Sequence, residues 1–73
     1  MGNKQKLLAA LRLRCQSLIE DGYSIIFTTD TKGWYYIKLH HRNGNYVSVI
    51  AYYDDYSIIQ RTNGLIVHDE KVC

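Results

Sequence analysis

The first part of the chain has the periodicity of an amphipathic helix. Between Lys4 and Asp21, apolar residues recur every three or four positions and form one stripe when wound at about 100° per residue. Asn3 is a suitable N-cap and Gly22 a suitable left-handed residue after the last turn, so we expect a helix over residues 4–21. The stripe consists of Leu7, Leu8, Leu11, Cys15, Leu18 and Ile19.

After Gly22 the period of the apolar residues changes to two. Segments rich in β-branched and aromatic residues alternate with short turn sequences, and such short connections make neighbouring strands antiparallel. We therefore expect an α+β fold in two layers, with one N-terminal helix on one face of a four- to five-stranded antiparallel meander. The strands are expected at about 23–29, 34–41, 45–53, 56–61 and 65–68. Ile58 and Ile59 both compete for the core, which leaves the register of the fourth strand open.

The first two hairpins predict which residues share a face of the sheet. We expect each to have a three-residue loop that ends in its glycine, a type I turn followed by a G1 bulge. Asp30 then pairs with Trp34, and His41 pairs with Asn45. A two-residue loop in the second hairpin would mix valines with lysine on one face, so the longer loop is favoured. The face expected under the helix carries Ile25, Phe27, Tyr35, Ile37, Leu39, Val47, Val49 and Ala51.

The opposite face is expected to be rich in aromatic residues, although a solvated antiparallel face normally carries polar side chains. Four aromatic residues of about 150–250 Å² each offer roughly 600 Å² or more, comparable with the ~800 Å² that each partner buries in a standard interface. We therefore interpret this face as a contact surface. Two alternatives are that the aromatic pairs only brace the sheet, or that the C-terminal segment covers them. The candidate partner-binding residues are Trp34, Tyr36, Lys38, His40, Tyr46, Ile50, Tyr52 and Arg61, with Ile26 and Thr28 extending the face on the first strand.

Composition is that of one small domain over residues 1–73. The chain has 73 residues, a formal net charge of +2, 47% apolar residues and no proline. No apolar run approaches the ~18 residues of a membrane span, and the first residues do not have the pattern of a signal peptide. Cys15 and Cys73 do not resemble the disulfide framework of small secreted domains. We expect Cys15 to be a buried apolar residue and the protein to be cytoplasmic.

Catalytic and metal-binding motifs are absent from the sequence. His40 and His41 are neighbours on a strand and point to opposite faces, so they cannot readily hold one metal ion, and His68 is interpreted as a surface or satisfied histidine. Asp54 and Asp55 are interpreted as an acidic turn. We expect no enzymatic activity, no cofactor and no metal site.

The first function hypothesis is a non-enzymatic module that masks the surface of a protein partner. In size and order of elements the chain resembles small accessory proteins of bacteriophages and mobile elements, including anti-CRISPR and anti-restriction inhibitors, and the resemblance implies an inhibitor. The same face could instead pair with its copy in a two-fold homodimer. The expected anchors are Trp34, Tyr36, Tyr46 and Tyr52, with Lys38 and Arg61 giving polar contacts at the rim.

The alternative is a single-stranded DNA- or RNA-binding domain that uses the same face. Exposed aromatic rings stack on bases, and nearby cations hold the phosphates. Only about four cations could reach the strand, and Asp54 and Asp55 would repel phosphates at one end, so this hypothesis ranks second. Its residues are Trp34, Tyr36 and Tyr52 for stacking, with Lys38, His40, Arg42 and Arg61 beside them. Neither a membrane nor a small-molecule substrate is expected.

Overall fold

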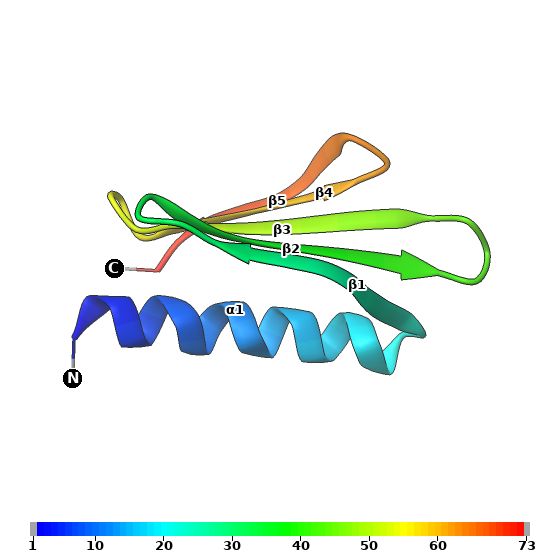
Figure 1. Ribbon diagram of the computed structural model, residues 1–73, viewed down its shortest axis with the longest axis horizontal. Helices are drawn as coiled ribbons and strands as arrows, with labels where there is room; N and C mark the ends of the chain where they lie inside the picture. Colours follow the sequence, from blue (N-terminus) through cyan, green and yellow to red (C-terminus); the bar gives the residue numbers. More distant parts are fainter. Residues whose placement is uncertain (1, 73) are drawn as a thin grey trace.

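The computed structural model describes residues 2–72, and in this range a helix lies on one face of a five-stranded antiparallel sheet (Figure 1). The strands follow one another in the order of the chain, so the predicted two-layer α+β meander is confirmed. The last strand extends to Lys71, beyond the predicted end at His68, and Cys73 lies outside the described residues. The elements are α1 (Asn3–Glu20), β1 (Tyr23–Asp30), β2 (Trp34–His41), β3 (Tyr46–Tyr52), β4 (Ser57–Thr62) and β5 (Leu65–Lys71).

The start of α1 differs from the prediction, whereas the glycine after its last turn has the predicted conformation. The N-cap is Gly2 and not Asn3, and the backbone carbonyl of Gly2 accepts hydrogen bonds from the amides of Gln5 and Lys6 at 3.1 and 3.3 Å. The apolar stripe begins only at Leu7, so it does not determine the first turn. The helix ends at Glu20, one residue before the predicted end, and Asp21 is its C-cap; the predicted left-handed residue is confirmed, because Gly22 has a φ of +103°.

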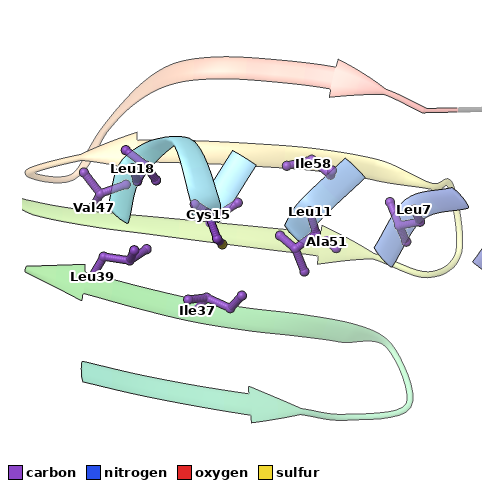
Figure 2. Close-up of a cluster of buried hydrophobic side chains, with 10 residues drawn as sticks. Leu7, Leu11, Cys15, Leu18, Ile37, Leu39, Val47, Ala51 and Ile58 are labelled. Atoms are coloured by element: carbon purple, nitrogen blue, oxygen red, sulfur yellow. The ribbon is translucent and has the colours of Figure 1, made fainter. Parts of the chain in front are cut away.

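The core lies between α1 and the middle strands of the sheet. Side chains from successive turns of the helix point onto β3 and β4, and Ile58, not Ile59, joins them from β4 (Figure 2). Burial of these apolar side chains is the main favourable contribution to folding. The buried apolar residues are Leu7, Leu11, Cys15, Leu18, Ile37, Leu39, Val47, Val49, Ala51 and Ile58.

The register of the first hairpin differs from the prediction. Asp30 pairs with Tyr35 rather than with Trp34, a shift of one position. A shift by one residue moves each side chain to the other face of the sheet. Phe27 therefore pairs with Lys38 and lies on the face away from α1, and not in the core as predicted.

The side chain of Thr31 explains this shift. Its hydroxyl accepts hydrogen bonds from the backbone amides of Gly33 and Trp34, at 3.2 and 3.1 Å, and its own amide donates to the Trp34 carbonyl at 2.9 Å. Thr31 and Trp34 therefore close the turn. Gly33 does not adopt the positive φ that the predicted bulged loop requires, whereas Gly44 and Gly64 do.

A β-bulge then returns the first half of β1 to the predicted register. Ile25 pairs with Leu39 as predicted, and Ile26 is the extra residue of the bulge. Thr28 was predicted on the face away from the helix, but it pairs with Ile37 on the helix side. Ile25 also faces the helix side, yet it is exposed because α1 lies mainly over β3 and β4 (Figure 2).

The second hairpin agrees with the prediction. The amide of His41 donates to the carbonyl of Asn45 at 2.9 Å, and Gly44 has a φ of +99°. Leu39 consequently pairs with Val47, so both hairpins have a common apolar face over most of their length.

Candidate functional site

The face of the sheet opposite to α1, called here the open face, has no segment folded over it in the described part of the chain. β5 lies beside β4 at the edge of the sheet and does not cross the open face (Figure 1). The alternative that the C-terminal segment covers the aromatic residues is therefore wrong for residues up to Val72. The strand pairs place all the predicted site residues on this face: Trp34 with Tyr52, Tyr36 with Ile50, Lys38 with Ser48, His40 with Tyr46, and Arg61 beside Ser48.

Three aromatic rings contact one another in a row across β1 and β2. The ring centroids of Trp34 and Tyr36 are 6.4 Å apart with an interplanar angle of 76°, and those of Tyr36 and Phe27 are 6.1 Å apart at 61°. Such edge-to-face contacts favour the observed orientation of each ring. Trp34 is 37% exposed and Phe27 is 54% exposed, so the row forms both a packed and an accessible surface.

Phe27 belongs to this surface although the sequence pattern places it in the core. The residue in the sequence that indicates this position is Thr31, because its hydroxyl can close a turn in place of a glycine-based bulge. Gly33 in the same turn indicates the bulged loop instead, so the sequence alone favours the wrong register. The row of Trp34, Tyr36 and Phe27 is called here the aromatic row.

A second part of the open face is basic. The ring of Tyr46 lies 4.6 Å from the ring of His40, and Lys38 Nζ is 5.0 Å from the Tyr46 centroid, within cation–π distance. Next to them is a shallow depression of about 310 Å³ between Tyr36, Lys38, Tyr46 and Arg61, and no carboxylate lines it. This depression can accept a small acidic or polar group.

Acidic residues lie at the other end of the sheet, and hydrogen bonds hold two of them, Asp30 and Asp55. Asp55 accepts hydrogen bonds from the hydroxyl and the amide of Ser57, at 2.7 and 3.1 Å, and the hydroxyl bond holds its pKa below the ordinary value. Tyr53 donates to Asp30 at 2.7 Å; partial burial and this bond raise the pKa of Tyr53 to about 12. These contacts stabilise the turns and leave both groups poorly suited to proton transfer.

The histidines are separated as the sequence predicts. His40 packs on the open face, whereas the ring of His41 contacts Tyr23, with centroids 5.0 Å apart, and its Nε2 lies 3.2 Å from the carbonyl oxygen of Asp21. Within residues 2–72, no three His, Cys, Asp or Glu side chains are grouped closely enough to hold a metal ion. Cys15 is buried as predicted, and burial raises the pKa of its thiol to about 11, which makes it a poor nucleophile.

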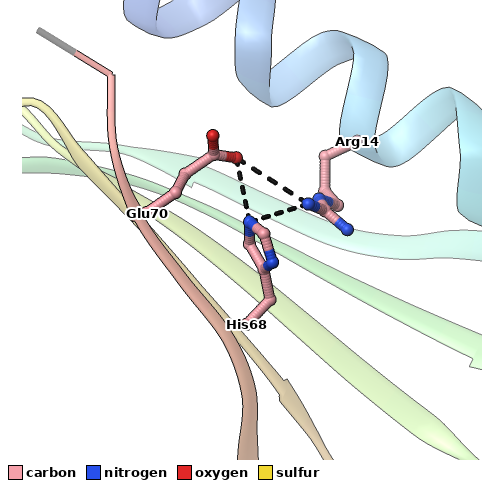
Figure 3. A network of polar contacts seen from close by, with 3 residues as sticks. All are labelled: Arg14, His68 and Glu70. Carbon is pink, nitrogen blue, oxygen red and sulfur yellow. Dashed lines mark hydrogen bonds and ion pairs between the residues drawn. The ribbon is translucent and has the colours of Figure 1, made fainter.

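His68 belongs to a polar cluster between α1 and β5, on the helix side of the sheet (Figure 3). Its Nε2 lies 2.7 Å from Arg14 Nη2 and 3.0 Å from Glu70 Oε1, and Arg14 and Glu70 are 3.8 Å apart. The same nitrogen accepts from Arg14 when it is unprotonated and donates to Glu70 when it carries a proton. The cluster connects the helix with the last strand and agrees with the interpretation of His68 as a satisfied histidine.

Comparison of the chain with protein families, with curated protein sequences and with solved structures gives no match. Over residues 2–72, no helix combines the length and the apolar character needed to cross a membrane. The chemistry of the open face is therefore the basis for a function.

Proposed function

We propose that this chain is a non-enzymatic protein-binding module that covers part of a partner's surface with its open face. The observation that carries the proposal is the aromatic row, in which Trp34, Tyr36 and Phe27 hold one another edge to face on a side of the sheet that α1 does not cover. Tryptophan and tyrosine are the residues that most often dominate binding energies. Rings that are already held in place lose little conformational freedom when a partner binds.

The geometry of the rings favours a protein partner over single-stranded nucleic acid. Bases stack on flat ring faces that are free, but the rings of the aromatic row meet edge to face. Tyr46 is already in contact with Lys38 and His40. In addition, the acidic turn with Asp54 follows directly after β3, where it would repel a phosphate backbone.

The small size of the chain supports an inhibitor as the kind of module. Within residues 2–72 no cluster of His, Cys, Asp or Glu could hold a metal ion and the thiol of Cys15 is buried, so occupying a partner's surface, as an inhibitor encoded by a bacteriophage or a mobile element would, is the simplest action for this domain. A cytoplasmic location, which a buried thiol at Cys15 accommodates, is part of the same proposal.

The test compares Trp34→Ala/Tyr52→Ala with a matched control, Leu13→Ala, which removes an exposed apolar side chain from α1. Proteins retained by immobilised wild type from a bacterial lysate are identified, purified and titrated against all three proteins by calorimetry. We expect the double variant to bind at least 30-fold more weakly and the control to bind like wild type, since anchor residues contribute ~2 kcal/mol or more. A retained protein that binds the double variant as tightly as wild type would contradict the proposal, as would the absence of any protein specific to wild type.

A second candidate is single-stranded nucleic acid, and the depression between Lys38 and Arg61 is the feature that favours it. Labelled 20-nucleotide DNA of mixed sequence is titrated at low salt against wild type and a Lys38→Ala/Arg61→Ala variant. A protein-binding module should show no saturation at tens of micromolar protein. Binding that depends on both cations, with a salt slope near −1.4 for two phosphate contacts (about −0.7 each), would favour nucleic acid instead.

A further inference from the structure

The edge of the sheet formed by β1 has little protection against pairing with another strand, since the bulge at Ile26 is its one protective feature. Between Tyr23 and Thr29 the strand contains no charged side chain and no proline, and its outer side is unpaired in this chain. Three consecutive large apolar residues, Ile25, Ile26 and Phe27, are 45%, 52% and 54% exposed. Soluble proteins usually protect such an edge with charged residues, because its free backbone groups can pair with another strand.

The opposite edge, formed by β5, is protected in this way. Its first residues are apolar and exposed, but its second half contains His68, Asp69, Glu70 and Lys71. Two of these, His68 and Glu70, are also held by Arg14 from the helix. Antiparallel pairing of another strand along β5 would place its partners beside this run of charges. The two edges of one sheet therefore differ in their suitability for pairing.

The exposed apolar surface of β1 continues on both faces of the sheet. On the helix side, Ile25 and Ile37 line an apolar groove of about 400 Å³ between α1 and the strands, and Ile19 from α1 lines the same groove. On the open face, Phe27 lies at the end of the aromatic row. A strand added to β1 would cover apolar side chains on both sides, in addition to satisfying backbone groups.

We propose that β1 pairs antiparallel with β1 of a second copy of this chain about a two-fold axis, which joins the two sheets into one. An antiparallel pairing centred on β1 sets Asp30, the one charged residue of the strand, opposite Tyr23 of the other copy, so no like charges lie directly opposite each other. A two-fold contact also uses the same edge on both copies and closes at two, which leaves the charged β5 edges outside.

The charges that flank β1 support a second copy as the occupant. Glu20 and Asp21 precede the strand, and Lys32 follows it. Antiparallel pairing centred on the strand brings the start of one β1 beside the end of the other, which sets Asp21 of each copy opposite Lys32 of the other. Asp30, the acidic residue at the end of the strand, is held by the hydroxyl of Tyr53 at 2.7 Å.

The size of this contact predicts a weak dimer. The exposed parts of Ile19, Ile25, Ile26 and Phe27 amount to a few hundred Å² per copy, below the ~800 Å² per partner of a standard interface. We therefore expect dissociation constants in the micromolar range and a monomer–dimer equilibrium at laboratory concentrations.

The bulges of the two edge strands supply matched variants. Ile26 is the extra residue in β1, and the pairing of β4 with β5 leaves Val67 as the corresponding extra residue in β5. They are 52% and 56% exposed, so Ile26→Lys and Val67→Lys place the same charge at equivalent positions on the two edges. Circular dichroism and thermal melting establish that each variant is folded.

Sedimentation velocity from about 1 µM to about 1 mM is the measurement. We expect the mass of wild type to rise from 8.5 kDa towards twice that value. Val67→Lys should behave like wild type, and Ile26→Lys should remain monomeric. A wild type that stays monomeric at 1 mM would overturn the proposal, and so would a dimer that withstands Ile26→Lys.

Two further measurements test the position of the junction. Amide hydrogen exchange of wild type should slow in β1 with rising protein concentration and stay unchanged in β5. This measurement uses wild type alone, so it does not depend on the folding of any variant. Trp34→Ala/Tyr52→Ala should still dimerise, so a failure of the proposed function is distinguishable from a failure of this inference. Loss of the dimer in that double variant, with retention in Ile26→Lys, would place the contact on the open face and overturn the edge pairing.

Discussion

At the scale of single residues, Gly22 determines the path of the chain from α1 to β1. Its φ of +103° lies in a region that other residues rarely adopt, and a Cβ at this position would lie 2.7 Å from Nε2 of His41. We expect Gly22→Ala to lower the free energy of unfolding by about 2–3 kcal/mol, since backbone strain and a steric conflict add. The measurement is urea denaturation followed by circular dichroism.

Gly44 provides the control for this prediction. It has nearly the same φ, +99°, but a Cβ would meet no atom within 4 Å. Gly44→Ala should therefore show the strain alone, about 1 kcal/mol. Adding His41→Ala should reduce the cost of Gly22→Ala in a double-mutant cycle. Equal losses for the two glycines would mean that the contact with His41 does not constrain the junction.

Tyr53 makes the stability of the fold dependent on alkaline pH. Partial burial and the hydrogen bond to Asp30 raise the pKa of Tyr53 from 10.0 to about 12. The folded protein thus holds this proton more tightly than the unfolded chain, so the stabilisation is complete below pH 10 and is lost as the pH rises through 12. We expect the urea midpoint of wild type to fall more steeply than that of Tyr53→Phe across this range. Parallel pH profiles would show that the hydrogen bond does not contribute to stability.

At the scale of elements, the cluster of Arg14, His68 and Glu70 connects β5 with α1 (Figure 3). The side chains of Arg14 and Glu70 are 31% and 39% exposed, so solvent weakens the interaction. We expect Arg14→Ala to lower the free energy of unfolding by about 0.5–1 kcal/mol and to accelerate amide exchange mainly in β5. Arg12→Ala, which removes an arginine from the other flank of the helix, should leave the exchange of β5 unchanged. Acceleration across all strands would indicate a loss of global stability instead.

The hairpins show how far the sequence predicts these elements. The second hairpin was predicted correctly because Gly44 adopts the positive φ that its loop requires. The first was wrong by one residue because the hydroxyl of Thr31 closes the turn without a left-handed Gly33. The bulge at Ile26 then compensates for that shift, and no local pattern identifies such a compensation. The periodicity of apolar residues therefore does not predict where a side chain closes a turn, and this is why the register of the first hairpin was missed.

A residue of the candidate site was placed on the correct face where the register of its hairpin was predicted correctly. Residues on β2 and β3, such as Trp34 and Tyr52, depend on the second hairpin and were placed correctly. Phe27 depends on the first hairpin and was missed. The exposed edge of β1 was also missed, because the width of sheet that a helix covers depends on tertiary packing and not on the pattern of either element.

At the scale of the whole molecule, the two faces of the sheet differ in burial, and the proposed function gives them separate roles. The helix side contains the buried core, including Leu39, which is fully buried. The open face contains partly exposed rings such as Trp34, whose packing involves neighbours on the same face. A substitution on one face should therefore affect stability and a substitution on the other should affect binding.

Leu39→Ala and Trp34→Ala test this separation directly. Leu39→Ala leaves a cavity in the core and should lower the free energy of unfolding by about 2–5 kcal/mol, a large part of the total for a small domain. Trp34→Ala should lower the free energy of unfolding by only about 0.5–1 kcal/mol, because it removes cross-strand contacts from a partly exposed face. The same substitution should weaken partner binding at least tenfold. The measurements are urea denaturation by circular dichroism and calorimetric titration of the partner at a temperature where both variants are folded. If Trp34→Ala lowered the free energy of unfolding as much as Leu39→Ala, the aromatic row would be part of the folding core. Its role would then be to brace the sheet.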